Sequence, residues 1–367
     1  MPQKKIGSFS VDFLQILDEN GKCDSKLMPK LDNEQIRKMY EYMVTTRLFD
    51  DKALNLQKQG RMGTWASSLG EEASHVGTAF ALAKDDWLFP SFREHGAYIA
   101  RNYPMHMLYQ FWGGDEKGEQ VPENMNVFTA AIPVGTQITH AVGTAWAMKI
   151  KKKKSATMVY FGDGATSKGD FHEGLNFSGV FKAPVIFVCS NNQYAISIPV
   201  KNQTAAKTIA QKALAYGING IRVDGNDVFA VYAATQEALK RAKEGKGATL
   251  LECFTYRVGH HTTSDDSARY RSQKEVDEWK KKDPIERLRR YMVTKKIWNK
   301  KDEATLREEA KKMIESIVQK YESLTPPAIE DIFSYTYKEM TPQLKEQLEE
   351  LKEVEKNDNN EHGSSDQ

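Results

Sequence analysis

Three short apolar segments, separated by helical stretches, constrain the fold of this chain more than any other feature. They are Thr157–Phe161 (TMVYF), Val185–Cys189 (VIFVC) and Thr249–Tyr256 (TLLECFTY), and each is apolar almost throughout. Strands buried on both faces have this pattern, which is typical of a parallel sheet covered by helices. We therefore predict an α/β fold with a mostly parallel sheet and helices on both of its faces.

The first two segments enclose a unit of strand, glycine-rich loop, helix and strand. The helix is predicted to begin at Asp170, with Glu173 completing a capping box, and to end before Pro184. The crossover of such a unit is right-handed. Another helix is predicted from Asp227 to Lys243, where Gly245 would stop it.

Four regions are expected along the chain. Residues 1–31 are interpreted as an N-terminal arm, 32–283 as the α/β domain, 284–348 as a helical C-terminal region and 349–367 as a disordered polar tail. The α/β domain should open with a long amphipathic helix from Asp32, because apolar residues recur there at helical spacing up to a stop at Gly60.

The composition excludes several classes of protein. Lys and Arg together number 52 against 50 Asp and Glu, so no global charge favours nucleic acid or an anionic membrane. The basic run Lys149 to Lys154 fits a solvated helix end better than a partner-binding patch. Three cysteines without metal-site spacing indicate a reducing compartment. Because no signal peptide or 18-residue apolar stretch is evident, we expect a soluble, cytoplasmic protein.

The most informative segment for chemistry runs from Gly162 to Ser197. Asp163 follows one predicted strand and Asn192 follows the next, about thirty residues later, so both should lie at the ligand-binding edge of the sheet. Their side-chain oxygens suit Mg²⁺, with a backbone carbonyl near Tyr194 as a third ligand. The glycine-rich loop would let backbone amides donate to phosphate oxygens. A Gly-Asp-Gly or an Asn-Asn pair alone is more often a simple turn; only their combination favours a site.

This combination resembles the thiamine diphosphate signature, and the chain from about Asp32 to Leu348 is similar to the alpha subunits of the 2-oxo acid dehydrogenase family. The family includes enzymes for pyruvate and for branched-chain substrates. The resemblance implies the thiamine diphosphate-binding fold, with thiamine diphosphate and Mg²⁺ as cofactors. It also implies roles for five residues. Asp163, Asn192 and the carbonyl of Tyr194 would hold the metal, and Gly164 and Ala165 would lie beside the diphosphate.

Two further stretches resemble family segments. SFREHG (Ser91–Gly96) is similar to a segment in which a Tyr-Arg pair holds the diphosphate, so Arg93 would be a phosphate ligand, while Phe92 lacks the hydroxyl of the usual tyrosine. A surface ion pair is the alternative for Arg93, and His95 fits a structural role better than a catalytic one. IPVGTQ (Ile132–Gln137) resembles the loop that meets the aminopyrimidine ring, which points to Ile132 and Val134. Thr136 and Gln137 are compatible with either a monovalent cation site or a helix cap.

The segment Tyr256–Arg271 resembles the active-site loop of the family, and its His-His pair is close to the branched-chain version. The resemblance makes His261 the imidazole beside the thiazolium ring, acting as a general acid or hydrogen-bond donor, and brings Arg257 near the phosphate. Asp265 and Asp266 are expected to order the loop. A metal site at the two histidines is disfavoured because neighbouring side chains point apart and no third ligand stands at metal spacing.

Two departures from the family leave questions open. Thr262 stands where mitochondrial relatives have a regulatory serine, so that regulation is not transferred. Phe111–Pro122 lacks a second histidine that some bacterial pyruvate-type relatives have, which leaves substrate handling open.

The resemblance also implies partners. In two-chain members the glutamate that activates the cofactor lies on a beta subunit, so an α2β2 tetramer that passes acyl groups to a lipoyl acyltransferase core is expected, with no nucleic acid or membrane partner. Pyruvate is the favoured substrate; a branched-chain 2-oxo acid, which the GHHTTSDDS loop favours, and acetoin are the alternatives. A phosphoryl-transfer protein is disfavoured by the absence of a P-loop motif. A non-catalytic interaction subunit is disfavoured by the intact site residues.

Overall fold

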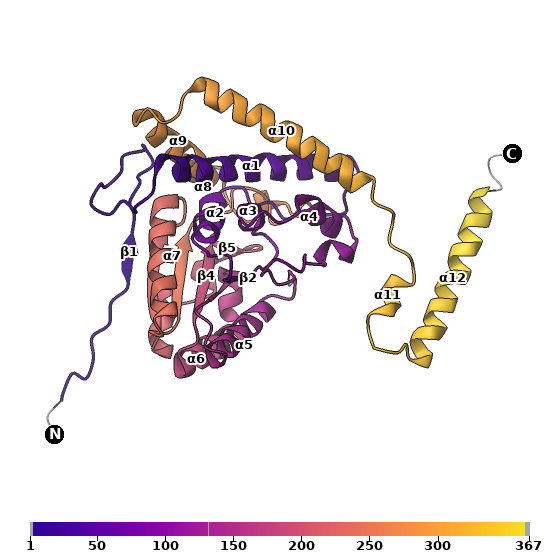
Figure 1. Cartoon of the computed structure of the whole chain (residues 1–367), viewed down its shortest axis with the longest axis horizontal. Coiled ribbons are helices and arrows are strands. Elements are labelled where there is room, and N and C mark those ends of the chain that lie inside the picture. Colours follow the sequence, from indigo (N-terminus) through magenta and orange to yellow (C-terminus); the bar gives the residue numbers. More distant parts are fainter. Residues whose placement is uncertain (1–2, 131, 364–367) are drawn as a thin grey trace. The chain divides into compact units, whose positions relative to one another are not determined.

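The computed structural model describes residues 3–130 and 132–363. It separates into two units, residues 1–319 and residues 320–367. The first unit contains the sheet and its helices (Figure 1). Ala131 in the IPVGTQ region and residues 364–367 of the predicted tail lie outside the described residues.

The first unit is organised around a six-stranded parallel sheet with the order β1-β7-β8-β4-β3-β2. The three predicted strands are confirmed as its neighbouring central members, β3 (Thr157–Gly162), β4 (Val185–Asn191) and β8 (Thr249–Phe254). The sequence pattern did not predict the other three, β1 (Asp12–Leu14), β2 (Trp87–Phe89) and β7 (Asn219–Asp224). The α/β fold class is therefore confirmed.

Helices cover both faces of this sheet, as the alternation of side chains along β3 shows. Val159 and Phe161 belong to a core cluster with α5 (Thr136–Ile150) and α6 (Gly169–Phe181). Tyr160 points to the opposite face, where its hydroxyl lies 2.7 Å from Thr78 Oγ1. That face carries α2 (Glu72–Phe80) and α7 (Val228–Lys243), which pack with α1 (Asn33–Lys58) and α9 (Pro284–Thr294) in a second core cluster (Figure 1).

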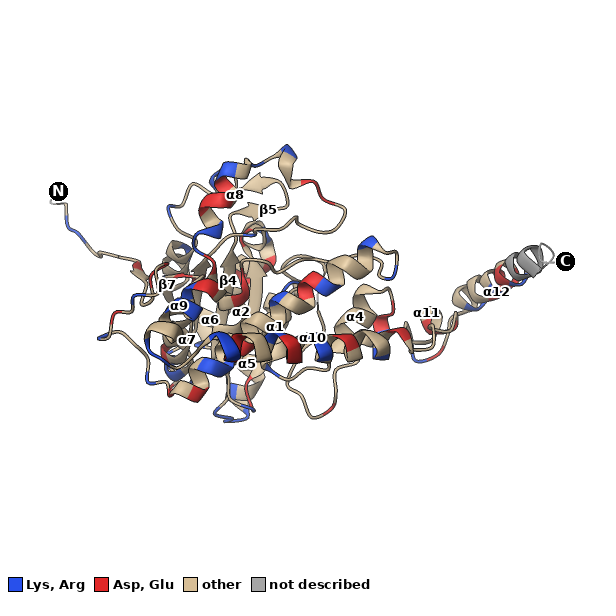
Figure 2. Cartoon of the chain, turned by 90° about the horizontal axis from the view of Figure 1, so that it is seen from above, with Lys and Arg blue, Asp and Glu red and all other residues tan. Residues whose placement is uncertain are grey.

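The remaining elements surround this framework. In the first unit they are α3 (His95–Ala100), α4 (Met105–Trp112), α8 (Gln273–Lys280), the β5–β6 hairpin (Tyr194–Ala195 and Ile198–Pro199) and short 3₁₀ turns that include Asp163–Ser167. α10 (Lys300–Glu322) follows α9, and acidic and basic side chains are interspersed along it (Figure 2). Within residues 3–130 and 132–363, no helix is both long and apolar enough to cross a membrane.

Two predicted helix starts are confirmed, and one is wrong in detail. Asp32 and Gln35 form a complete capping box on α1, and Asp227 caps α7. The α6 helix begins at Gly169, and no side-chain capping bond is present at its start. The box predicted from Asp170 does not form because the helix follows a 3₁₀ turn directly, so its N-cap position falls on the extended Lys168.

The N-terminal arm is tied to the domain more firmly than its irregular sequence suggests. β1 pairs with β7 at the edge of the sheet. The carboxylate of Asp227 accepts the backbone N–H groups of Ile16 and Leu17, at 2.6 and 2.7 Å, in addition to capping α7. A single buried carboxylate therefore joins the arm to the start of a core helix.

The second unit contains α11 (Asp331–Ser334) and α12 (Pro342–Gly363). The α12 helix runs through much of the region from residue 349 onward that the sequence predicted to be a disordered tail. Leu344, Leu348 and Leu351 recur at helical spacing in its first half, a signal that the polar composition of the segment obscured.

Candidate active site at the carboxyl edge of the sheet

A cavity of about 510 Å³ opens at the carboxyl ends of β3 and β4. Ligands of open α/β sheets bind at this edge. The residues predicted from the sequence to bind a cofactor all line this cavity, although they come from widely separated parts of the chain: Phe92, Arg93, Ile132, Val134, Asp163, Gly164, Ala165, Asn192, Tyr194, Arg257 and His261. The structure therefore brings the whole predicted set together.

Asp163 directly follows β3 and Asn192 directly follows the adjacent strand β4, and both are buried. Asp163 Oδ2 accepts a hydrogen bond of 2.6 Å from Gln203 Nε2, and burial raises the pKa of the carboxyl group to about 6. Asn192 Nδ2 donates to Glu71 Oε1 at 2.9 Å. The amide oxygen of Asn192 therefore faces the turn at Tyr194, where it accepts the Tyr194 N–H at 3.4 Å. A carboxylate, an amide oxygen and the Tyr194 carbonyl form a hard-oxygen donor set that suits Mg²⁺.

The local backbone explains why these groups meet. Gln193 and Ile196 both adopt positive φ, 78° and 54°, and fold the chain after β4 into the β5–β6 hairpin. A Cβ atom added at Gly164 would lie only 2.7 Å from the Cβ atom of Ala195. The loop after β3 therefore requires glycine in order to approach this hairpin so closely.

Arg93 and Arg257 converge on His261 in the wall of the cavity. Arg93 Nη2 lies 3.1 Å and Arg257 Nη1 lies 3.2 Å from His261 Nδ1. Because a guanidinium group can only donate, Nδ1 must accept, and the ring proton lies on Nε2. Burial, followed by the charges of Arg93 and Arg257, lowers the pKa of His261 to about 3. The ring is therefore a neutral hydrogen-bond donor at physiological pH.

The two arginines carry more positive charge than their surroundings neutralise. Arg257 is fully buried. Within the described residues its guanidinium contacts the carbonyls of Tyr194 and Ile196, the hydroxyl of Tyr270 and the His261 ring, and no carboxylate accepts a hydrogen bond from it. Arg93 is also buried, and its nearest carboxylate oxygen, on Glu71, is 3.9 Å away. Buried cations without paired carboxylates are costly, so the cavity suits an anionic ligand.

The surface ion pair considered for Arg93 does not form, because this side chain is only 6% exposed. Its Nη1 donates to the Ser67 carbonyl at 2.5 Å, and its Nη2 donates to the His261 carbonyl at 2.9 Å. These bonds hold the guanidinium plane in one orientation. Phe92 contacts His261 edge to face, with 6.1 Å between ring centroids.

Ile132 and Val134 form the exposed apolar wall of the cavity. The chain then turns through Gly135, whose φ is 93°, into α5. Gly135, and neither Thr136 nor Gln137, occupies the N-cap position, and Gln137 is buried with its Nε2 donating to the Tyr160 carbonyl at 2.7 Å. Gln137 thus anchors α5 to β3, and the cap interpretation of Thr136 and Gln137 is wrong.

His95 has the geometry of a structural residue. It is buried, its Nε2 donates to the Ala66 carbonyl at 2.9 Å, and its ring stacks on Trp65 at 4.2 Å between centroids. Burial lowers its pKa to about 3. His95 is not among the residues that line the cavity.

The loop after β8 is ordered by its own carboxylates. Asp265 accepts the backbone N–H of His261 at 2.7 Å and the Tyr270 hydroxyl at 2.5 Å. Asp266 caps the next 3₁₀ turn. His260 Nδ1 accepts from Ser267, whereas His261 faces the cavity, so the two histidines do not share a ligand.

Sequence reasoning missed several cavity residues, among them Glu71, which is 1% exposed. Glu71 and Glu72 follow one another at the start of α2, a pattern that indicates only acidic residues in the first turn of a helix. Burial raises the pKa of Glu71 to about 7. Gln203 was also missed, and Trp112 lies in the cavity wall although the Phe111–Pro122 stretch offered no histidine. Their roles depend on contacts across the fold that no local pattern encodes.

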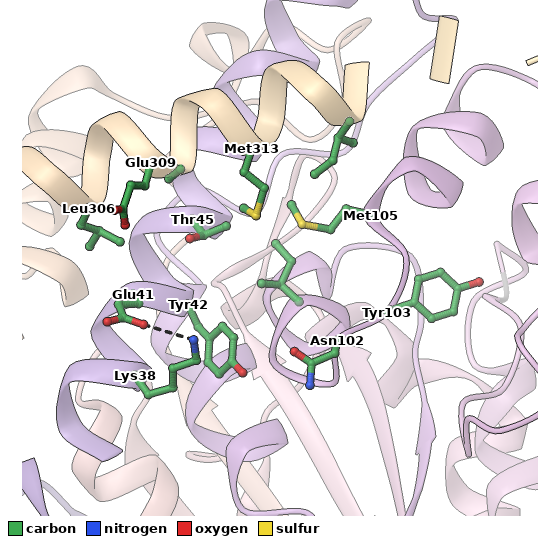
Figure 3. A pocket seen from close by; sticks show the side chains of 13 residues that line it. Lys38, Glu41, Tyr42, Thr45, Asn102, Tyr103, Met105, Leu306, Glu309 and Met313 are labelled. Atoms are coloured by element: carbon green, nitrogen blue, oxygen red, sulfur yellow. Dashed lines mark hydrogen bonds and ion pairs between the residues drawn. The ribbon is translucent and has the colours of Figure 1, made fainter. Parts of the chain in front are cut away.

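A second cavity, of about 520 Å³, lies away from the sheet edge, between α1, the region around α3 and α4, and α10 (Figure 3). Its wall combines apolar side chains such as Met105 and Met313 with the exposed Lys38–Glu41 pair at 3.2 Å. None of the predicted site residues lines it. The chemistry predicted from the sequence is therefore concentrated at the sheet edge.

The sequence matches the family described as Dehydrogenase E1 component over residues 40–330. It is 45% identical to the pyruvate dehydrogenase E1 component subunit alpha of Acholeplasma laidlawii, over 91% of this chain and 98% of that relative. The protein of the same name from Bacillus cereus is 42% identical over 96% of each chain. That from Staphylococcus aureus strain Mu50 is 42% identical over 94% of each chain.

Proposed function

The chain belongs to the dehydrogenase E1 component family, among the alpha subunits of 2-oxo acid dehydrogenases, and from this premise we propose that it acts with a beta subunit in the oxidative decarboxylation of pyruvate. The acetyl group would then pass to the lipoyl domain of an acyltransferase core. The names of relatives that match over nearly their full length support pyruvate as the substrate.

The observation that carries the proposal is the buried pair of arginines at an oxygen-rich sheet edge. Arg93 and Arg257 would neutralise the diphosphate of thiamine diphosphate, and a planar guanidinium fork suits phosphate oxygens. Asp163, Asn192 and the Tyr194 carbonyl would hold Mg²⁺, which reduces the remaining phosphate charge. When bound, the cofactor would supply a nucleophilic thiazolium carbon and a ring that accepts the electron pair released on decarboxylation.

Other parts of the cavity would complete the cofactor site. Gly164 and Ala165 lie in the 3₁₀ turn after β3, where their backbone N–H groups are available to phosphate oxygens. Ile132 and Val134 would pack against the aminopyrimidine ring, because they are exposed apolar residues of the cavity wall. Phe92 would contribute only ring packing, since it has no hydroxyl group.

His261 would act on the substrate through Nε2. Because the two arginines fix Nδ1 as an acceptor, Nε2 carries the proton and donates without a change of protonation state. This neutral donor can bind a carboxylate or carbonyl oxygen of the oxo acid. It can later donate to the intermediate as the acyl group passes to one sulfur of the lipoyl disulfide, whose other sulfur takes up the two electrons and becomes a thiol. The bond from the His261 backbone N–H to Asp265 would hold the imidazole in place.

A beta subunit is proposed because the carboxylates that line the cavity already have other partners. Glu94 accepts the N–H groups of Ser91 and Arg93, Asp163 accepts from Gln203, and Glu71 accepts from Asn192. The glutamate that activates the cofactor would therefore come from the partner chain. An exposed apolar surface on α5 and α6 is consistent with a partner; it comprises Trp146, Ile150, Val180 and Phe181.

The proposal is tested by co-expressing the chain with a beta subunit encoded next to it. Decarboxylation of pyruvate and of 3-methyl-2-oxobutanoate is measured with and without thiamine diphosphate and Mg²⁺, and the isolated chain is the control. We expect cofactor-dependent turnover of pyruvate by the complex and none by the isolated chain. If the complex prefers the branched-chain acid, which the His260–His261 loop favours, the proposed substrate would be wrong. Robust activity of the isolated chain would overturn the need for a partner.

A further inference from the structure

Glu71 is a buried carboxylate of the cavity that the proposed cofactor chemistry leaves without a role. Its side chain is 1% exposed, whereas its neighbour Glu72 is accounted for by an ion pair with Arg47 at 2.6 Å and a hydrogen bond from the Gly70 N–H at 3.0 Å. The Glu71 carboxylate accepts a hydrogen bond from Asn192 Nδ2 at 2.9 Å, while Arg93 Nε and His75 Nε2 lie farther away, each 3.9 Å from one of its oxygens. Because burying a carboxylate is costly, its close contact with Asn192 calls for an explanation.

The side-chain amide of Asn192 must be oriented correctly in order to bind a metal ion, and Glu71 contacts that amide. An asparagine side chain has an oxygen at one position and an NH₂ group at the other, and only the oxygen can bind a metal ion. A rotation of the amide by 180° would turn the NH₂ group toward the cation. Glu71 Oε1 accepts from Nδ2, and it can do so whether or not the other carboxyl oxygen carries a proton. Together with the Tyr194 N–H, which donates to Oδ1 at 3.4 Å, this bond favours the orientation in which Oδ1 faces the turn at Tyr194.

The chain uses the same arrangement at the preceding residue. Asn191 Nδ2 donates to the buried Glu252 Oε1 at 2.7 Å, and its Oδ1 accepts from Gln193. Two successive asparagines at the end of β4 are thus each oriented by a buried glutamate. Only Asn192 lines the cavity.

Glu71 is itself held in a fixed position. Its N–H donates to the Ser68 carbonyl at 2.9 Å, and its carbonyl accepts from the His75 N–H at 3.2 Å as α2 begins. Gly70, with φ of 98°, packs so tightly that an added Cβ atom would lie 2.4 Å from the Tyr256 carbonyl oxygen. These backbone contacts hold the start of α2, and with it Glu71, in place beside Asn192.

We propose that Glu71 is a positioning residue, which holds the amide oxygen of Asn192 toward the magnesium ion by accepting from its NH₂ group. This role rests on the proposed function, because it requires a metal ion at Asn192. Groups that orient metal ligands commonly change metal affinity by about 10-fold to 100-fold when they are removed.

The test measures binding of thiamine diphosphate to the assembled complex as a function of Mg²⁺ concentration, by quenching of tryptophan fluorescence. In Glu71→Leu, which is similar in size but cannot accept a hydrogen bond, the half-saturating Mg²⁺ concentration should rise roughly 10-fold to 100-fold. In Glu71→Gln, whose amide oxygen still accepts, it should stay close to the wild-type value. Circular dichroism and assembly with the beta subunit verify folding.

A reciprocal exchange separates positioning from a general effect on structure. Asn192→Asp alone would place two carboxyl groups in contact and should weaken Mg²⁺-dependent binding. Combined with Glu71→Gln, it should recover much of that binding, because the new amide can donate to the new carboxylate. No recovery in the double variant, or an unchanged Mg²⁺ requirement in Glu71→Leu, would overturn the role of Glu71. Absence of Mg²⁺-dependent binding in the wild type would instead overturn the proposed cofactor site.

Discussion

Replacing Arg93 with methionine should weaken thiamine diphosphate binding strongly while leaving the cavity shape nearly intact. Methionine preserves much of the apolar stem of arginine and removes the guanidinium group, which is 6% exposed and fixed by the Ser67 and His261 carbonyls. A hydrogen bond to a charged group contributes about 1.5–3 kcal/mol. Its loss corresponds to roughly a 10-fold to 150-fold increase in the Kd of the cofactor.

The assay is calorimetric titration of thiamine diphosphate into the assembled complex at saturating Mg²⁺. Arg269→Met is the matched control, because the Arg269 side chain lies on the same loop as His261 but is 84% exposed. Arg93→Lys should bind with intermediate affinity, since one ammonium group cannot replace a fixed fork of donors. A Kd within twofold of wild type for Arg93→Met would refute the assignment of this arginine to the diphosphate.

Three further predictions address the division of roles, the response to pH and the backbone. Asp163→Ala should abolish cofactor binding, whereas His261→Ala should retain it and lose acyl transfer to lipoamide; equal loss of cofactor in both would contradict these roles. Burial and neighbouring His95 lower the pKa of His75 to about 3 from 6.5, so the unfolded chain takes up a proton that the folded chain does not as the pH falls between these values. The free energy of unfolding should therefore fall as the pH is lowered, with His75 contributing about 2 kcal/mol of the loss at pH 5. The urea midpoint of His75→Met should depend less on pH than that of the wild type. Parallel plots of midpoint against pH for the two proteins would argue against the effect. Gly70→Ala should lower the urea midpoint, because φ is 98° and the added methyl group would meet the Tyr256 carbonyl at 2.4 Å; an unchanged midpoint would show that the backbone there can relax.

The sequence itself determined the elements whose signal is local. The three central strands are recognisable because each is a continuous apolar run buried on both faces. The helix α1 is recognisable because apolar residues recur at helical spacing from Asp32 onward. Asp163 and Asn192 could be placed at one sheet edge because each comes just after a central strand, and parallel strands end on the same side.

The sequence was less informative for short strands, for a helix that directly follows a 3₁₀ turn, and for a helix of polar composition. β1 and β2 have three residues each, too few to display a period. The start of α6 was misplaced because Asp170 and Glu173 have the spacing of a capping box, while the preceding 3₁₀ turn fixes the N-cap at Lys168. The continuation of α12 beyond residue 349 was missed because that segment is almost entirely polar, with Leu351 as its only leucine.

Only the tertiary structure decided which polar groups face one another. Glu71 and Asn192 are separated by 121 residues, and Arg93 and His261 by 168. Contacts over such separations depend on the order of strands and on helix packing, which no local pattern encodes. The residues of the candidate site could therefore be predicted from the sequence alone, whereas the tautomer of His261 and the orientation of the Asn192 amide are fixed by partners that the fold brings to them.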